Sequence, residues 1–289
     1  MFNKASLSYL AVAFACSWGL VIGAWALGAE RQPLLAFLAI SFSMAGPAIG
    51  AVAGAFRFEP SGARAAVLGL RLRPNRWWLA AWAIGLALAL ASVAFTAWLS
   101  PHAYTDLRDA AIAITQASGQ TLPPEALAGV PSTATLVLLA ALVGAAINSV
   151  VLTFTEELGW RGYLHHLWRP FGFWRASLAT GVVWGVWHAP AILLFGHNYP
   201  DDRLLGAVLF VGFCVLLSPL FTLVRDRGRS VFAAGILHGT INALGALTVL
   251  AVGGAAFPWN GIVGIGGIIA LACGCLGVLA VRPGQAEPA

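Results

Sequence analysis

Charged side chains are scarce in this chain of 289 residues, because Asp, Glu, Lys and Arg together make up only 9% of it. A typical water-soluble domain carries about 25% charged residues, so the composition excludes an ordinary soluble enzyme or binding domain. Hydrophobic residues make up 60%, and the mean hydropathy is +0.84. Apolar stretches of about 20 residues without period-2 alternation predict membrane-spanning helices and exclude a β-barrel.

Lysine is nearly absent, with Lys4 as the single one, and the arginines fall into a few clusters between apolar stretches. Such clusters are typical of membrane topology, and no basic stripe is interleaved with aromatic residues, so nucleic acid is not an expected partner. The four cysteines lie inside apolar stretches and form no CxxC pattern. We therefore predict neither disulfides nor a cysteine metal site.

Eight apolar stretches are long enough to cross a bilayer, which predicts an all-α polytopic membrane bundle of about eight transmembrane helices. No repeat or linker divides the chain, so we expect residues 1–289 to form a single transmembrane domain. The expected spans are Leu7–Leu27, Leu34–Phe56, Trp78–Leu99, Thr133–Trp160, Trp174–Phe195, Leu204–Val224, Val231–Val252 and Gly261–Val281.

The basic residues favour one orientation of these spans. Of the sixteen basic residues, all but Arg31, Arg108 and Arg203 lie on the side shared by the N-terminus and the even-numbered loops. Cytoplasmic loops of membrane proteins carry an excess of Lys and Arg. Both termini are therefore predicted to lie in the cytoplasm.

Two adjacent carboxylates and an arginine follow the apolar part of the fourth stretch: Glu156, Glu157 and Arg161. An ionisable side chain at the bilayer centre costs about 2.5–3.5 kcal/mol on insertion scales, so we expect a functional site that faces the bundle interior. Glu157 and Arg161 are four residues apart and can pair on a helix, whereas Glu156 points about 100° away from Glu157. This asymmetry predicts one structural carboxylate, Glu157, and one carboxylate available for chemistry, Glu156.

Further polar residues lie in the fifth and seventh stretches, namely His188, and His238 with Asn242 one turn later. Glu156 lies sixteen residues before Gly172, where the fourth and fifth stretches turn, and His188 lies sixteen residues after it. At 1.5 Å per residue the two side chains reach similar depths if both helices are unbroken. We therefore expect Glu156, His188, His238 and Asn242 to line one cavity, which opens towards the cytoplasm.

These residues resemble the motifs of a known family. Glu156-Glu157-x-x-x-Arg161, Trp184-x-x-x-His188 and His238-x-x-x-Asn242 are similar to the three motifs of the CPBP intramembrane proteases. That family includes CAAX prenyl endopeptidases of the Rce1 type and bacterial Abi or bacteriocin-immunity proteins. Trp184 departs from the usual phenylalanine of the second motif. We take residues 133–252 as the core that carries the resemblance.

The resemblance implies hydrolysis of a peptide bond by water inside the membrane. It assigns activation of the water to Glu156 and His188, and stabilisation of the oxyanion to His238 and Asn242. General acid–base groups and fixed donors in a cavity of low dielectric constant suit these roles. The implied substrate is a membrane-associated protein or peptide in the lipid bilayer, and the implied location is a bacterial plasma membrane.

Two alternatives stay open. Glu156, His188 and His238 could hold Zn²⁺ with water in a fourth position, although the chain has no HExxH pattern on one helix. In the other alternative the protein is not an enzyme but an immunity factor, a scaffold, or a small transporter that uses the buried charges as a proton relay. A covalent nucleophile is disfavoured, because no serine or cysteine lies beside a histidine in the motifs.

Three other polar residues are not assigned to catalysis. His102 and His197 are expected to lie outside the membrane as interfacial residues. Asn148 lies two turns before Glu156, where it could line the cavity or contribute to helix packing.

Overall fold

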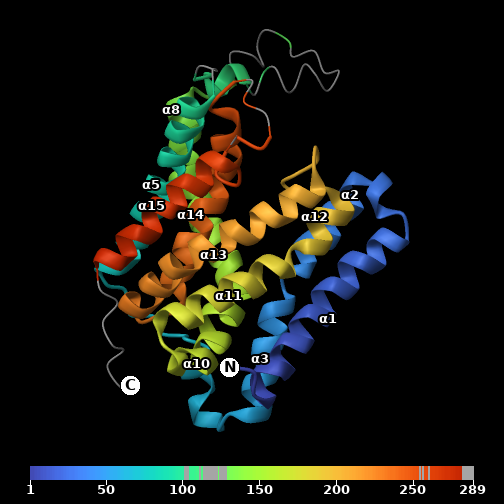
Figure 1. Cartoon of the computed structure of the whole chain (residues 1–289), viewed down its shortest axis with the longest axis vertical. Coiled ribbons are helices and arrows are strands. Elements are labelled where there is room, and N and C mark those ends of the chain that lie inside the picture. The colour runs from blue at the N-terminus through green and yellow to red at the C-terminus, as the bar shows by residue number, and fades with distance from the viewer. Residues whose placement is uncertain are drawn as a thin grey trace.

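The structure is a computed structural model that describes residues 1–100, 104–110, 112, 123, 129–253, 255, 257–259 and 261–281. Over these residues the chain forms a bundle of helices and no β-strand (Figure 1). The predicted all-α polytopic fold is confirmed. His102, which was expected to be an interfacial residue, lies outside the described residues.

The helices vary in length from single turns to 26 residues. They are α1 (Lys4–Ala26), α2 (Pro33–Ser43), α3 (Gly46–Phe58), α4 (Arg64–Val67), α5 (Arg76–Leu99), α8 (Thr133–Leu139), α9 (Ala145–Leu152), α10 (Leu164–Trp168), α11 (Phe173–Trp187), α12 (Ala189–Phe195), α13 (Arg203–Gly228), α14 (Val231–Leu250) and α15 (Ile265–Ala280). Two π-helical segments, η3 (Ala140–Gly144) and η4 (Thr153–Tyr163), and three 3₁₀ turns, η1 (Ala29–Arg31), η2 (Ser61–Ala63) and η5 (Arg169–Phe171), complete the described elements.

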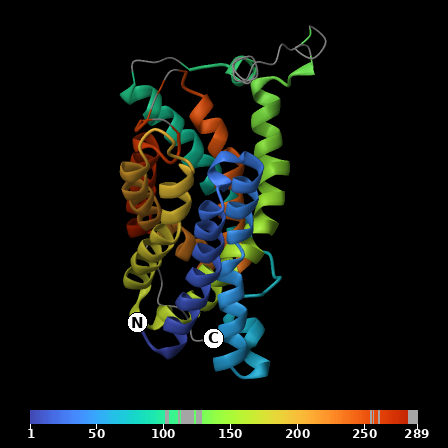
Figure 2. The ribbon, with the colours of Figure 1, turned by 90° about the vertical axis from the view of Figure 1, so that its right-hand side faces the viewer.

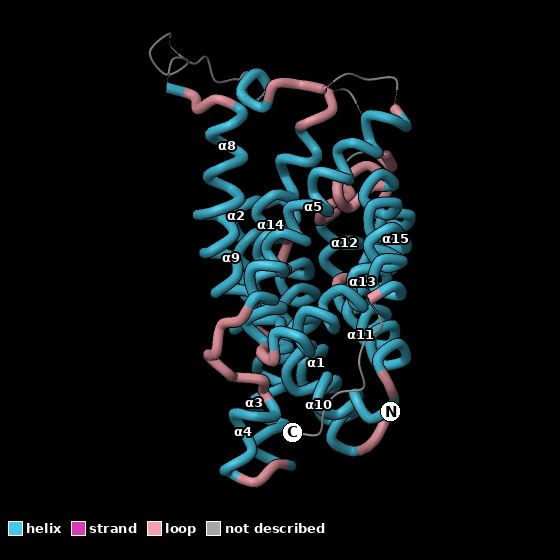
Figure 3. Tube along the Cα trace, turned by 90° about the vertical axis from the view of Figure 1, so that its left-hand side faces the viewer, coloured by secondary structure: helices cyan, strands magenta, loops and turns pink. Residues whose placement is uncertain are grey.

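Seven helical segments within the described residues are long and apolar enough to span a membrane. The longest of them, Thr133–Phe171, joins α8, η3, α9, η4, α10 and η5 without a gap, and Figure 3 traces it along one side of the bundle. The eighth predicted span corresponds to α15, which has only 16 residues. These spans make the chain an integral membrane protein.

Polar residues between the apolar stretches determine where several helices begin. The side chains of Asn3, Asn75, Ser132, Asp202 and Ser230 each accept a hydrogen bond from a backbone N–H in the first turn of α1, α5, α8, α13 and α14. Such caps satisfy donors that have no partner inside the helix.

Two of the predicted spans are broken, which the sequence analysis did not predict. The second span divides into α2 and α3 before Pro47, and the fifth divides into α11 and α12 at His188, before Pro190. Proline has no N–H to donate, so it is tolerated in the first turn of a helix but interrupts a helix interior. The predicted hairpin between the fourth and fifth spans is present, and Gly172 turns it with a φ of 87°.

The bundle has two different ends (Figures 1 and 2). One end holds the start of α1, helix α10, the connection from α3 to α5 and the turn from α13 to α14, and is called the N-terminal end below. The opposite end holds the connection from α1 to α2, the loop after α12 and the start of α8. Segment η4 lies between these ends and packs against α3, α9, α10 and α14.

Candidate active site

Glu157 and Arg161 form an ion pair inside η4, as predicted. Arg161 Nη1 lies 3.1 Å from Glu157 Oε1, and the two side chains are 1% and 0% exposed. Arg161 Nη2 donates to Ser218 Oγ at 3.1 Å, and the guanidinium carbon lies 4.5 Å from the ring centroid of Trp184 and 4.1 Å from that of Phe221. The buried arginine therefore has ionic, hydrogen-bonding and cation–π contacts.

His238 joins this ion pair from α14. Its Nδ1 lies 2.8 Å from Glu157 Oε1. An ionised carboxylate can only accept hydrogen bonds, so Nδ1 of His238 carries the proton and donates it. No local spacing relates positions 157 and 238, so this contact was not predicted from the sequence.

Glu156 has different partners from Glu157. Its Oε2 accepts a hydrogen bond from Trp184 Nε1 at 2.9 Å, and the side chain is buried. The neighbouring carboxylates therefore have different surroundings: Glu157 pairs with a cation, as predicted, and Glu156 contacts a neutral N–H group. Trp184 was noted in the sequence only as part of a motif, and its indole donor to Glu156 was not predicted.

His188 lies at the break between α11 and α12, one turn after Trp184. Its Nδ1 lies 2.8 Å from the backbone oxygen of Trp184, and because a carbonyl oxygen only accepts, Nδ1 carries the proton. The imidazole ring packs edge-to-face against Trp187 and Phe210, with centroids 4.6 and 4.5 Å away. These contacts fix the ring, and its Nε2 is the nitrogen left to accept a proton.

All four predicted catalytic side chains line the same cavity. Glu156, His188, His238 and Asn242 border a space of about 690 Å³, so the prediction that these residues converge on one cavity is confirmed. Asn148 borders it as well, in agreement with one of the two roles expected for it. The cavity is large enough for several residues of a peptide, since ligand cavities measure about 300–1,000 Å³.

The sequence pattern predicts a cavity that opens towards the cytoplasm, the side to which most of the arginines are assigned. From His238 the cavity follows α14 through Asn242 to Val249, and it reaches His197 and Asn198 in the loop after α12. It therefore extends towards the end of the bundle opposite to the arginine-rich, N-terminal end. His197 was expected to be an ordinary interfacial residue, but it lines the cavity.

Packing at the N-terminal end explains this difference. Arg225 Nε donates to the backbone oxygen of Arg161 at 3.0 Å, and Ser230 Oγ donates to the backbone oxygen of Arg71 at 2.6 Å. The N–H of Val231 donates to the oxygen of Gly69 at 3.0 Å. The first contact ties α13 to η4, and the other two tie the connection between α4 and α5 to the start of α14, so the elements at this end of the site are held together.

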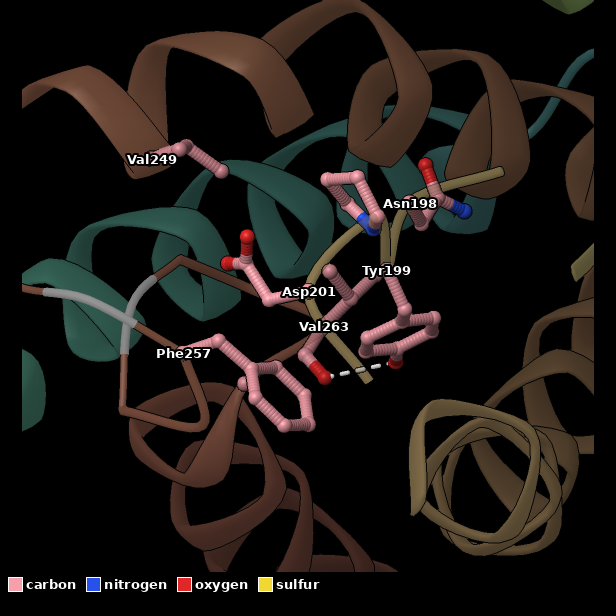
Figure 4. Close-up of a pocket in the computed structure, with 8 residues that line it drawn as sticks. Asn198, Tyr199, Asp201, Val249, Phe257 and Val263 are labelled. Atoms are coloured by element: carbon pink, nitrogen blue, oxygen red, sulfur yellow. Dashed lines mark hydrogen bonds between the residues drawn. The ribbon is translucent and has the colours of Figure 1, made fainter. Parts of the chain in front are cut away.

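A smaller cavity of about 150 Å³ lies beside the far end of the first (Figure 4). Asn198, Val249 and Val263 border both cavities. Tyr199 Oη donates to the oxygen of Val263 at 2.8 Å, which ties the loop after α12 to the segment before α15. No His or Glu is among the described residues that line this smaller cavity, so the larger one is the better candidate site.

A zinc centre does not fit the geometry. In the described part of the chain, no three His, Cys, Asp or Glu side chains lie close enough together to hold one metal ion. Glu156, His188 and His238 share the cavity without forming such a group. A catalytic zinc site needs three protein ligands around one ion.

Comparison with known proteins agrees with the motifs. Residues 131–244 match the family model described as type II CAAX prenyl endopeptidase Rce1-like. A protein named CAAX prenyl protease 2, from Methanococcus maripaludis, is 32% identical over 95 residues, which are 30% of this chain and 34% of that relative. The match thus spans about a third of the relative's length. Together, the motifs and these matches confirm the resemblance predicted from the sequence: residues 131–244 are similar to Rce1-like CAAX prenyl endopeptidases.

Proposed function

We propose that this protein is an intramembrane endopeptidase that hydrolyses a peptide bond of a membrane-associated protein or peptide. The family match of residues 131–244 supports the class of reaction. The observation that carries the proposal is the separation of the two carboxylates: Glu157 is engaged by Arg161 and His238, while Glu156 faces a cavity with His188.

Glu156 and His188 activate the attacking water. Trp184 positions both, because its indole N–H holds the carboxylate of Glu156 and its backbone oxygen holds Nδ1 of His188. Glu156 takes a proton from the water as the water oxygen forms a bond to the carbonyl carbon of the peptide. Nε2 of His188 accepts a hydrogen bond from the water and so orients it. When the carbon–nitrogen bond breaks, Glu156 returns the proton to the leaving amine.

His238 and Asn242 stabilise the oxyanion formed in this step. The amide nitrogen of Asn242 is a donor at any pH, whereas His238 already uses Nδ1 to donate to Glu157. His238 therefore donates to the oxyanion from Nε2 when the ring carries both protons, and the carboxylate of Glu157 lies beside it to balance that charge. Fixed donors in a cavity away from bulk water favour the transition state. No step of this mechanism uses a metal ion.

Residues 1–289 act as one domain in this proposal, with residues 133–252 as the core. Packing of α1 against α12, and of α3 against η4, supports the single domain, because helices that precede the core contact it directly. The arginine distribution supports a cytoplasmic location of both termini, and the family resemblance suggests a bacterial plasma membrane.

The proposal is tested with purified protein in liposomes. Candidate substrates come from comparing the membrane proteomes of cells that carry the wild-type protein or Glu156→Gln. We expect Glu156→Gln and His188→Ala to lower cleavage by about 100-fold or more, the usual contribution of a general base, without a change in helix content. Excess chelator is expected to leave cleavage unchanged.

The matched control is Glu30→Gln, because Glu30 is exposed, accepts a hydrogen bond from Trp25 Nε1 and does not line the cavity. This variant should cleave like the wild type. Wild-type cleavage by Glu156→Gln would contradict the mechanism. An ion flux driven by a pH gradient and lost in Glu156→Gln, without cleavage, would instead favour the transporter alternative.

A further inference from the structure

The two ends of the bundle differ strongly in basic residues. The N-terminal end carries Lys4, Arg57, Arg64, Arg71, Arg73, Arg76, Arg169, Arg175, Arg225, Arg227 and Arg229. The described residues at the opposite end include only Arg31, Arg108 and Arg203 as basic side chains. Because positive charge near span ends is retained in the cytoplasm, the N-terminal end is the cytoplasmic one.

The cavity lies in the half of the bundle remote from this basic end. On α14 the lining residues begin at His238 and recur on one helical face as far as Val249, a length of roughly 16 Å at 1.5 Å per residue. On α1, which starts at the basic end, the lining residues are Ser17, Trp18 and Val21, all in its second half. Helix α14 also starts at the basic end, so the lining residues of both helices place the cavity in the half of the bundle remote from that end.

The cavity wall is almost free of charge. Among the described lining residues, Glu156 is the only Asp, Glu, Lys or Arg. The remaining wall consists of uncharged polar groups and of apolar side chains such as Phe37, Met44 and Phe210. A negatively charged peptide would lose its hydration here without gaining a cationic Lys or Arg partner, and a positive charge would find a partner only at Glu156, whereas an uncharged apolar peptide loses no such hydration.

We propose that the site takes an uncharged, mainly apolar peptide segment that enters from the non-cytoplasmic face of the membrane. The substrate class is thus a membrane-associated chain whose cleaved bond lies in the outer half of the bilayer or just outside it. Phe37, which borders the cavity on α2, is 66% exposed, so the cavity mouth adjoins the lipid-facing surface as well. This inference rests on the proposed peptidase function, but it can be tested without any cleavage.

The orientation is tested by labelling single cysteines in intact cells with a membrane-impermeant maleimide. The background variant has Cys16, Cys214, Cys273 and Cys275 replaced by alanine. We expect Asp201→Cys, in the loop after α12, to be labelled in intact cells, and Arg73→Cys to be labelled only after the membrane is permeabilised. Ala246→Cys, which lies inside the cavity on α14, should also be labelled from outside.

The reverse pattern, with Arg73→Cys labelled in intact cells and Asp201→Cys protected, would overturn the proposed entry face. Labelling of Asp201→Cys without labelling of Ala246→Cys would show that the cavity is closed on the non-cytoplasmic side, and this result would also overturn the proposed entry face. Both outcomes are independent of Glu156, so they would leave the peptidase proposal intact. Size-exclusion profiles identical to that of the background variant confirm that each protein is folded.

The preference for uncharged peptides is tested by protection of Ala246→Cys in liposomes. A short capped peptide of Leu, Ala and Phe should block labelling of this cysteine, whereas the same peptide with two Asp substitutions should not. Equal protection by both peptides, or by neither, would overturn the inferred substrate class.

Discussion

Glu156 and Glu157 are neighbours in sequence, but their surroundings give them different chemistry. Glu157 accepts hydrogen bonds from Arg161 and from His238, and its side chain is completely buried. Glu156 is held by the indole of Trp184 and lies on the cavity wall. Removing the first carboxylate affects mainly the fold, and removing the second affects mainly the proposed reaction.

Glu157→Ala is expected to destabilise the protein by about 3–5 kcal/mol, the cost of leaving a buried charge without its partner. The physical reason is that Arg161 keeps its charge when Glu157 is removed. The measurement is the thermal unfolding of the variant in detergent. The double variant Glu157→Met with Arg161→Met removes both charges and should unfold at a higher temperature than Glu157→Ala. If the double variant is the less stable one, the ion pair does not have this structural role.

The part of this site that can be predicted from the sequence is the part that depends on residue spacing. The pairing of Glu157 with Arg161 follows from their spacing on one helix, and the convergence of Glu156 with His188 follows from counting residues around Gly172. The contact between Glu157 and His238 joins segments 81 positions apart, and no periodicity encodes it. The bond from Trp184 to Glu156 depends on the side-chain conformation of both residues, which spacing does not determine.

Among the helices, α14 has the closest packing to the fourth span. Gly239 faces Ser149 of α9, and a methyl group on Gly239 would overlap the backbone nitrogen of Ser149 and come within 2.6 Å of its Cα. Small residues allow such close approach of membrane helices. This contact sets the position of His238, the preceding residue, relative to Glu157.

Gly239→Ala is therefore expected to destabilise the bundle by about 1–3 kcal/mol, as is usual for an overpacked core, because the atoms it meets belong to a backbone. Gly212→Ala on α13 is the matched control, since no atom lies within 4 Å of the position of its added methyl group. The control should unfold at the wild-type temperature or slightly above it, because alanine favours helix. Equal loss of stability in both variants, measured by thermal unfolding, would contradict close packing at Gly239.

At the level of elements, hydropathy predicts the spans but not their breaks or their helical type. Pro190 is visible in the sequence, yet the hydrophobic stretch continues through it, so the break at His188 was not predicted. The glutamates and Arg161 were placed on an α-helix, whereas η4 is π-helical. Segments of this kind are frequent at functional sites, and they depend on tertiary packing rather than on local preference.

At the scale of the whole molecule, the cavity forms between two parts of the bundle. Helices α1 and α2 provide one wall, and α14 provides another, while α11 and α12 carry His188 between them. The direction of its opening could not be predicted from spacing, because it depends on which end the long-range contacts of Arg225 and Ser230 close. Spacing predicts that the site residues converge on one cavity, but the opening depends on packing around the whole bundle.

Filling this cavity from α2 is expected to block the proposed reaction without disturbing the catalytic side chains. Ser41 lines the cavity, whereas the neighbouring Phe42 does not and is 68% exposed. Ser41→Trp places an indole in the space that a peptide would occupy, so kcat/KM should fall by about tenfold or more, equivalent to at least about 1.4 kcal/mol. Phe42→Trp adds the same ring on the outer surface of the same helix and should cleave like the wild type. Wild-type activity of both variants in liposomes would mean that substrate does not pass between α2 and α14. An equal loss of activity in both variants would trace the effect to α2 itself rather than to the cavity.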